Sequence, residues 1–261
     1  MGMVALALLL ACSRPVEAPQ ELDALVGFLF AHAMDEDPAA LAAGGDNLAV
    51  WMDTRLDETL EGYAVRTLDQ TTLDGLDDAT RSAEGLVGAA VGHESPHDPT
   101  TIAASQLTTD PLVRDADTVL AYAREDQGDM ACFLDHRCGT FAYESWVTAS
   151  LPLSLEVTSH NLVQWRWVEL SDGGEALVQR NWMVGAAELN VDWLDVLAQY
   201  YLWVSIPHGD GSRNMYATWA QTRLTGTDVP ETLALHLAVE DMVGAADEMD
   251  AWISANPAPS W

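Results

Sequence analysis

Two histidines, His93 and His97, stand four residues apart in the sequence His93-Glu94-Ser95-Pro96-His97. On a helix this H-E-x-x-H spacing would place both imidazoles on one face, where they bind zinc while the glutamate acts as a general base. Pro96 opposes a helix, because proline removes a backbone hydrogen bond and clashes with the preceding turn. We therefore expect a polar loop. His93 and His97 remain weak candidates for a metal site outside a helix, and metal-dependent hydrolysis is the least favoured function.

Cys132 and Cys138 are a second pair of residues whose types could do chemistry, as a disulfide or as metal or redox ligands. Five residues separate them, which differs from the C-x-x-C spacing of redox and zinc motifs. In an oxidising compartment we expect a disulfide, which on the chain-entropy model stabilises the fold by about 2 kcal/mol. The alternative is a metal or redox site in which Asp135 and His136 join the two cysteines.

The third cysteine, Cys12, follows an uncharged apolar run from Met3 to Ala11 that is too short to span a bilayer. The sequence Leu9-Leu10-Ala11-Cys12 resembles the lipobox of bacterial lipoproteins. This resemblance implies a signal peptide over 1–11, a lipid on Cys12 and a periplasmic or cell-surface location. Ser13 in place of Asp favours the outer membrane in that group. The alternative is a buried N-terminal helix with an inert cysteine.

The charge balance narrows the range of partners. Forty-one Asp and Glu residues face eleven basic residues, all of them Arg, and the net charge is −30. Such a chain repels nucleic acid and anionic lipid, so we expect neither as a partner. Salt would relieve the self-repulsion, and a melting temperature that rises with salt would support adaptation to a saline habitat. The alternative is a surface that serves solubility alone.

The sequence contains no P-loop, G-x-G-x-x-G or G-x-S-x-G motif. We therefore expect no cofactor, and we favour a binding or interaction protein over an enzyme.

The elements that must position these residues follow from the spacing of apolar side chains. After a tether over 12–20, residues 21–81 form a predicted helical region. Leu86 to Val91 predicts a strand, and Gln106 to Arg124 has a helical pattern. The remaining structure over 82–254 is expected to be an antiparallel sheet and a final helix, in one domain with the preceding helices.

From Thr148 onward the apolar period changes to two, which is typical of strands. Ser171-Asp172-Gly173-Gly174 and His208-Gly209-Asp210-Gly211 are hairpin turn signals. Sequential hairpins predict an antiparallel meander of about five strands.

The last helix has the clearest pattern. Asp228-Val229-Pro230-Glu231 matches a capping box, and Asn256-Pro257 ends the helix before a tail over 255–261. One apolar stripe must be buried, and the adjacent sheet is the expected partner. The stripe comprises Leu235, Val239, Met242, Ala246, Met249 and Ile253.

The predicted sheet is unusually rich in large aromatic residues. Tryptophan against a long helix can simply fill the core. The alternative is an apolar cavity between sheet and helix that holds a ligand. The candidate ligand-binding residues are Trp165, Trp167, Trp182, Tyr201, Trp203 and Trp219.

The predicted order of elements, an α+β arrangement with N-terminal helices, an antiparallel meander and one long C-terminal helix, resembles the helix-grip fold of START-like proteins. That resemblance covers about 82–254 and rests on element order, without a diagnostic motif. It implies an apolar small molecule or lipid between sheet and helix. A surface interaction protein with a filled core is the alternative.

Overall fold

The computed structural model describes residues 17–76, 81–151, 154–225, 227–228 and 231–256. Cys12, the expected signal peptide over 1–11, part of the capping box and most of the expected tail lie outside these residues. Within them, no helix combines the length and the apolar composition that crossing a membrane requires.

The chain begins with two helices, α1 (Leu22–His32) and α2 (Ala39–Arg55). The apolar residues at helical spacing in α1 are fully buried, because they form the face that packs on the sheet: Leu22, Leu25, Val26, Leu29 and Phe30. A short 3-10 helix (Leu56–Thr59), strand β1 (Tyr63–Val65) and helix α3 (Gln70–Asp74) follow. The predicted helical region therefore also contributes a strand.

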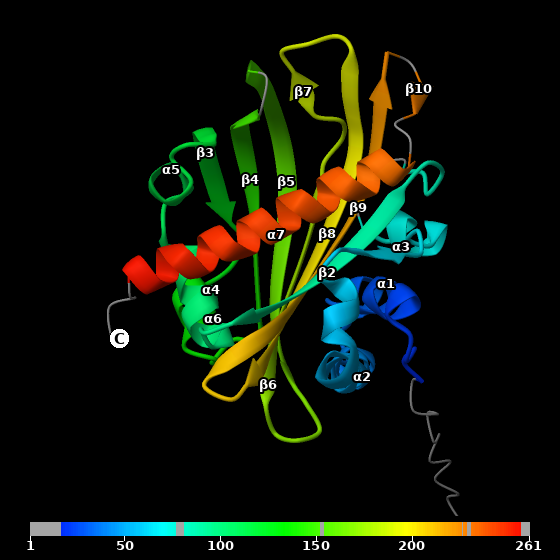
Figure 1. Ribbon diagram of the computed structural model, residues 1–261. Coiled ribbons are helices and arrows are strands. Elements are labelled where there is room, and N and C mark those ends of the chain that lie inside the picture. The colour runs from blue at the N-terminus through cyan, green and yellow to red at the C-terminus, as the bar shows by residue number, and fades with distance from the viewer. Residues whose placement is uncertain (1–16, 77–80, 152–153, 226, 229–230, 257–261) are drawn as a thin grey trace, which may run out of the picture.

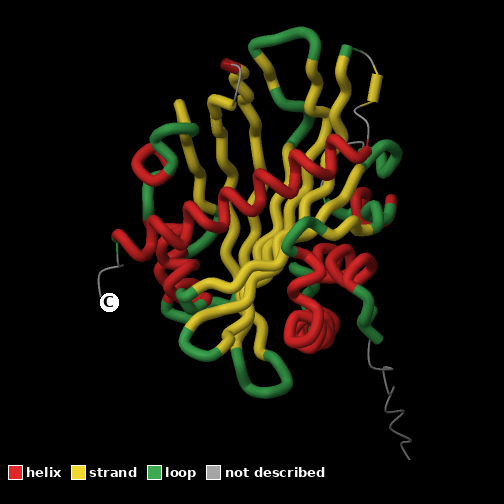
Figure 2. The backbone as a smooth tube through the Cα atoms, in the orientation of Figure 1, coloured by secondary structure: helices red, strands yellow, loops and turns green. Residues whose placement is uncertain are grey.

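The ten strands found among the described residues form one curved antiparallel sheet, in the order β1-β2-β9-β8-β6-β5-β4-β3, with β10 paired to β9 and β7 to β5 (Figures 1 and 2). The two glycine turns predicted from the sequence connect β5 to β6 and β8 to β9. The strands after β1 are β2 (Val87–Ser95), β3 (Val119–Asp126), β4 (Thr140–Leu151), β5 (Leu155–Glu169), β6 (Glu175–Met183), β7 (Glu188–Leu189), β8 (Leu194–His208), β9 (Gly211–Leu224) and β10 (Thr227–Asp228).

The prediction of about five strands was too low, because β1 to β3 and most of β4 precede the region where the apolar period is two. Strand β2 is rich in Gly and Ala and shows no alternation. Its small residues allow close packing: a Cβ at Gly92 would collide with the side chains of Leu56 and Thr59. The Gly92 amide also donates to Thr59 Oγ1 at 2.8 Å.

The helices described after β2 are α4 (Pro99–Thr108), α5 (Pro111–Arg114), α6 (Met130–Leu134) and α7 (Glu231–Ala255). The predicted helix over Gln106 to Arg124 is wrong. Pro111 starts a separate turn that Asp110 caps, and the residues from Val119 join the sheet as edge strand β3.

Helix α7 crosses the sheet diagonally, from the region of β10 to that of α4 (Figure 1). The C-terminal part of its predicted apolar stripe is buried: Met242, Ala246, Met249 and Ile253 are at most 6% exposed. The predicted fold class is confirmed, since the chain is α+β with N-terminal helices, an antiparallel sheet and a long C-terminal helix on that sheet.

The sheet separates two hydrophobic cores, because successive side chains of a strand point to opposite faces. We call the face under α7, α4 and α6 the α7 face, and the face under α1 and α2 the α1 face. Neighbours in β8 show the division: Trp203 belongs to the core of the α7 face, and Leu202 and Val204 belong to the other core.

Candidate functional site

The six aromatic residues predicted to line one cavity lie on both faces of the sheet. Trp165, Trp167, Tyr201 and Trp203 face the core under α7. Trp182 and Trp219 face α1 and are at most 2% exposed there. The single six-residue site is therefore corrected to a smaller set on the α7 face. The cause is the register between β6 and β8. Gln179 of β6 pairs with Trp203, so both side chains point to the same face. Trp182 lies three positions after Gln179, and an odd spacing along a strand places it on the opposite face.

Trp167 belongs to a separate group of contacts around the Cys132–Cys138 disulfide. Cys132 and Cys138 are bonded, with Cα atoms 5.3 Å apart, as the sequence predicts. The indole of Trp167 donates to the carbonyl of Phe133 at 3.1 Å and stacks on His136, with ring centroids 4.2 Å apart. His136 Nδ1 lies 2.5 Å from Glu175 Oε2. Trp167 is therefore held in place by the disulfide loop, and we assign it a structural role.

The other aromatic residues of the α7 face form a continuous row. Trp165 and Trp203 meet edge to face, with centroids 5.7 Å apart. Trp203 stacks on Tyr216 at 5.8 Å, and Tyr216 lies 6.4 Å from Tyr201. Burial raises the pKa of Tyr216, and the nearby charge of Asp250 raises it further, so its hydroxyl stays protonated. The row offers apolar ring surface with hydroxyl and indole donors at its edges.

Several polar atoms of this face are buried without a hydrogen-bond partner in the described chain. Trp165 Nε1 and Tyr216 Oη belong to the aromatic row, although the Trp165 indole also interacts with the hydroxyl of Tyr143. Ser205 Oγ lies beyond Trp203 on the same face of β8. Ser105 Oγ, on α4, is a fourth such atom, and Trp51 Nε1, on the other side of the sheet, is the fifth. A buried donor without an acceptor costs about 1–3 kcal/mol. Three of these groups, the hydroxyls of Tyr216, Ser205 and Ser105, have no polar partner in the described residues, which is uncommon for buried hydroxyls.

Helix α7 is fixed over this row by one carboxylate. Asp250 Oδ2 lies 2.7 Å from His93 Nε2, and Asp250 Oδ1 accepts a hydrogen bond from Ser95 Oγ at 2.6 Å. His97 Nε2 lies 3.2 Å from the Asp250 carbonyl and 3.1 Å from Ser254 Oγ. The hydrogen bond with Asp250 raises the pKa of His93, against the lowering effect of burial.

This geometry corrects the interpretation of the H-E-x-x-H sequence. His93 to Ser95 belong to strand β2, so the expected polar loop is wrong for these residues. His93 and His97 do not lie on a helix, as the zinc arrangement requires, and both contact α7. In the part of the chain that the structure describes, no three His, Cys, Asp or Glu side chains gather as metal ligands. The motif joins the sheet to α7.

No protein-family model matches the chain, and no curated protein matches its sequence. Among solved structures it is similar to a STAR-related lipid transfer protein from Xanthomonas axonopodis, at 14% identity over 66% of this chain and 95% of that chain, with a TM-score of 0.41. A START superfamily protein from Mycobacterium smegmatis has 9% identity over 64% and 97%, with a TM-score of 0.40. Human STARD10 has 11% identity over 74% and 83%, with a TM-score of 0.41. At these values the likeness assigns no activity to the chain.

Three residues of this face, Tyr216, Ser205 and Asp250, were not predicted from the sequence. In β9 the sequence pointed only to Trp219, which faces α1 together with Met215 and Ala217. Tyr216 alternates with them and faces α7. Asp250 directly follows Met249 of the apolar stripe. A carboxylate at the edge of a buried stripe is a signal that a partner is needed, although the sequence does not say which one.

Proposed function

We propose that the protein binds an amphipathic small molecule beneath α7. The apolar part of this ligand lies along Trp165, Trp203 and Tyr216, and a carbonyl or hydroxyl oxygen accepts hydrogen bonds from the unpartnered donors. The observation that carries the proposal is the group of buried polar atoms on the α7 face. Apolar walls with a few convergent polar groups are the usual composition of a small-molecule site.

The exposure along α7 suggests where such a ligand would enter. In the C-terminal half of the helix the stripe residues are buried and Asp250 fixes the helix to the sheet, whereas the stripe residues Leu235 and Val239 in the first half are only partly buried. The first half therefore has fewer contacts to break, and the entrance is placed beside it. A small outward movement of that half would open the aromatic row.

The substitution Tyr216→Phe tests the proposal, since it removes the hydroxyl and keeps the ring stacked on Trp203. We expect the ligand-free variant to be as stable as the wild type or up to about 1 kcal/mol more stable, because an unpaired buried hydroxyl is lost. We expect about 5-fold to 10-fold weaker binding of monodecanoin, an uncharged probe with an ester carbonyl. Urea unfolding measures the first effect. The signals of Met242 and Met249 in protein labelled with [methyl-13C]methionine measure the second.

The matched control is Tyr200→Phe, on the α1 face, whose hydroxyl is within 3.5 Å of Arg81 Nη1. It should leave monodecanoin binding unchanged. The proposal fails if monodecanoin does not shift Met242 or Met249. It also fails if Tyr216→Phe lowers stability and keeps full affinity, because the hydroxyl would then have a partner within the protein.

We further propose that a lipid on Cys12 anchors this domain at the periplasmic or outer-membrane surface. The apolar run that ends in Leu9-Leu10-Ala11-Cys12 supports the proposal. Mass spectrometry of protein from the membrane fraction should show a mature N-terminus at an acylated Cys12. Cys12→Ala should remain unprocessed and unacylated. An unmodified Cys12 in membrane-extracted protein would contradict the anchor and leave the ligand proposal intact.

A further inference from the structure

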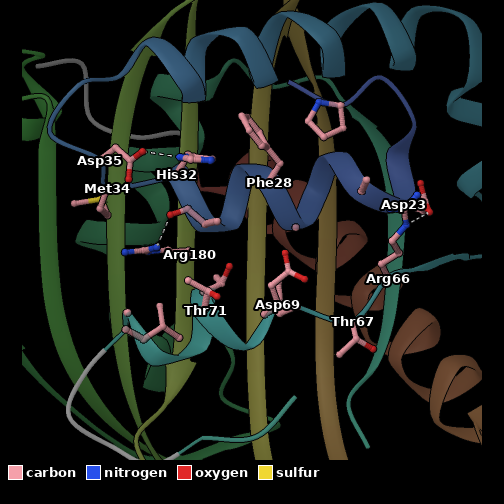
Figure 3. Close-up of a pocket in the computed structure, with 18 residues that line it drawn as sticks. Asp23, Phe28, His32, Met34, Asp35, Arg66, Thr67, Asp69, Thr71 and Arg180 are labelled. Atoms are coloured by element: carbon pink, nitrogen blue, oxygen red, sulfur yellow. Dashed lines mark hydrogen bonds and ion pairs between the residues drawn. The ribbon is translucent and has the colours of Figure 1, made fainter. Parts of the chain in front are cut away.

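A groove of about 720 Å³ lies on the opposite side of the sheet from α7, between α1 and α3 (Figure 3). One wall is a side of α1 where small residues, Ala24, Gly27 and Ala31, alternate with Phe28 and His32. The other wall is the extended segment before α3 and α3 itself. We call this space the α1–α3 groove. Its volume is within the range of small-molecule sites, about 300–1,000 Å³.

Arg180 lines this groove from strand β6 and is only 9% exposed. Its Nη1 donates to the carbonyls of Phe30 at 2.9 Å and Ala31 at 3.5 Å, and its Nε donates to Gln164 Oε1 at 2.8 Å. The two carbonyls belong to the last turn of α1, where the helix dipole favours a cation. None of these contacts uses Nη2. Arg180 thus keeps donor capacity on a guanidinium that borders the groove.

Arg180 also differs from most of the other arginines in its charge partners. Six of them each pair with a carboxylate: Arg55, Arg66, Arg114, Arg124, Arg137 and Arg213. No carboxylate oxygen in the described chain lies within ion-pair distance of Arg180. Desolvation lowers the pKa of Arg180 to about 10, and the charge of Asp35 opposes this shift only in part. A buried cation without a counter-charge is costly, and an anionic ligand would relieve that cost.

The acidic residues of the groove limit which anion fits. Asp23 is paired with Arg66 at 2.6 Å, and Asp35 with His32 at 2.6 Å (Figure 3). Asp69 adds a third carboxylate to the lining. A phosphate dianion would be repelled by this set more strongly than a carboxylate with one charge. The half-buried side chains of Phe28 and Met34 give the same space an apolar surface.

We propose that the α1–α3 groove is a second binding site, distinct from the one beneath α7, and that it takes a small amphipathic carboxylate. The carboxylate pairs with Arg180 at the end of the groove where His32 and Asp35 lie. The apolar part extends along Phe28 and Met34. The two sites lie on opposite faces of the sheet, so they share no lining residue and their ligands differ in charge.

Decanoate is the probe, and protein labelled with [methyl-13C]methionine reports the site. Met34 borders the groove, whereas Met242 and Met249 belong to α7 and pack in the core between α7 and the sheet. Decanoate should shift the signal of Met34, and decan-1-ol should bind there about 10-fold more weakly. Arg180→Gln should weaken decanoate binding about 10-fold and leave decan-1-ol unchanged, since only the charged interaction is lost.

Arg166→Gln is the matched control. Arg166 donates to the carbonyl of Asp35 at 2.5 Å from the neighbouring strand and does not line the groove, so decanoate affinity should stay within about 2-fold. Should Arg180→Gln fail to fold, Gly27→Leu carries the test. A Cβ at Gly27 has ordinary contact with Leu68 at 3.8 Å, and the longer side chain fills the groove. The proposal is overturned if decanoate leaves Met34 unshifted, or if the folded variant binds decanoate as the wild type does. Neither result depends on monodecanoin at Met242 and Met249.

Discussion

Replacing Asp250 by Ala should destabilise the protein by about 3 kcal/mol, because one side chain satisfies two groups of the sheet. Asp250 and His93 are 14% and 19% exposed in their side chains. Removal of the carboxylate leaves both His93 Nε2 and Ser95 Oγ without their acceptor. Urea unfolding of the ligand-free protein measures the loss.

Asp247→Ala is the natural control, since Asp247 is on the same helix, lies 4.0 Å from His93 Nδ1 and is 70% exposed. An exposed ion pair contributes little, so this variant should stay within about 0.5 kcal/mol of the wild type. Equal losses for the two variants would show that the Asp250 contacts do not hold α7 on the sheet.

The same pair gives stability a defined pH dependence. Because the pKa of His93 is raised in the folded protein, its contribution is fully present below the ordinary histidine value, near pH 6.5. It is lost as the pH rises through the folded pKa. The stability difference between wild type and His93→Gln should therefore be larger at about pH 6 than at about pH 9. The comparison isolates His93 from the general repulsion of an acidic chain. A difference that grows with pH would contradict the assigned contact.

Local pattern predicted the long strands in the second half of the sheet well, because β5, β6, β8 and β9 have apolar residues at period two and the turns within each pair contain glycine where the backbone needs it. Gly173 and Gly209 adopt φ values of +85° and +59° in these turns. The first half was harder. Leu112 and Val113 contribute to the helical pattern over Gln106 to Arg124, but they are 40% and 61% exposed, so their apolar character reflects no core contact.

The candidate site was predicted only in part. Alternation along one strand shows which of its residues share a face, but it does not show which residues of another strand point to that same face. Trp182 and Trp203 each alternate correctly within their own strand, yet they face opposite cores. Relating them needs the register across β6 and β8, and β8 also contains an irregularity between Val196 and Ala198. The contact of Asp250 with His93 joins residues 157 positions apart, which no local pattern reveals.

Trp219→Ala tests the division of the aromatic residues and should cost about 3–5 kcal/mol, the usual loss for a buried tryptophan. Trp219 is fully buried, meets Phe30 edge to face at 5.7 Å and donates from Nε1 to the carbonyl of Arg66 at 2.7 Å. Trp203→Ala, on the other face, should cost a similar amount, since Trp203 is 3% exposed and bonds Asn214. Urea unfolding gives both values.

Ligand binding should then distinguish the two variants, although their losses of stability are similar. Trp219→Ala should keep the response of Met242 and Met249 to monodecanoin, because its cavity opens toward α1. It should weaken decanoate at Met34, since Arg66 forms part of that groove and loses its tie to the sheet. Trp203→Ala should show the reverse. If both variants lost both responses in the folded state, the two faces would act as one unit, and the sheet would not separate two independent sites.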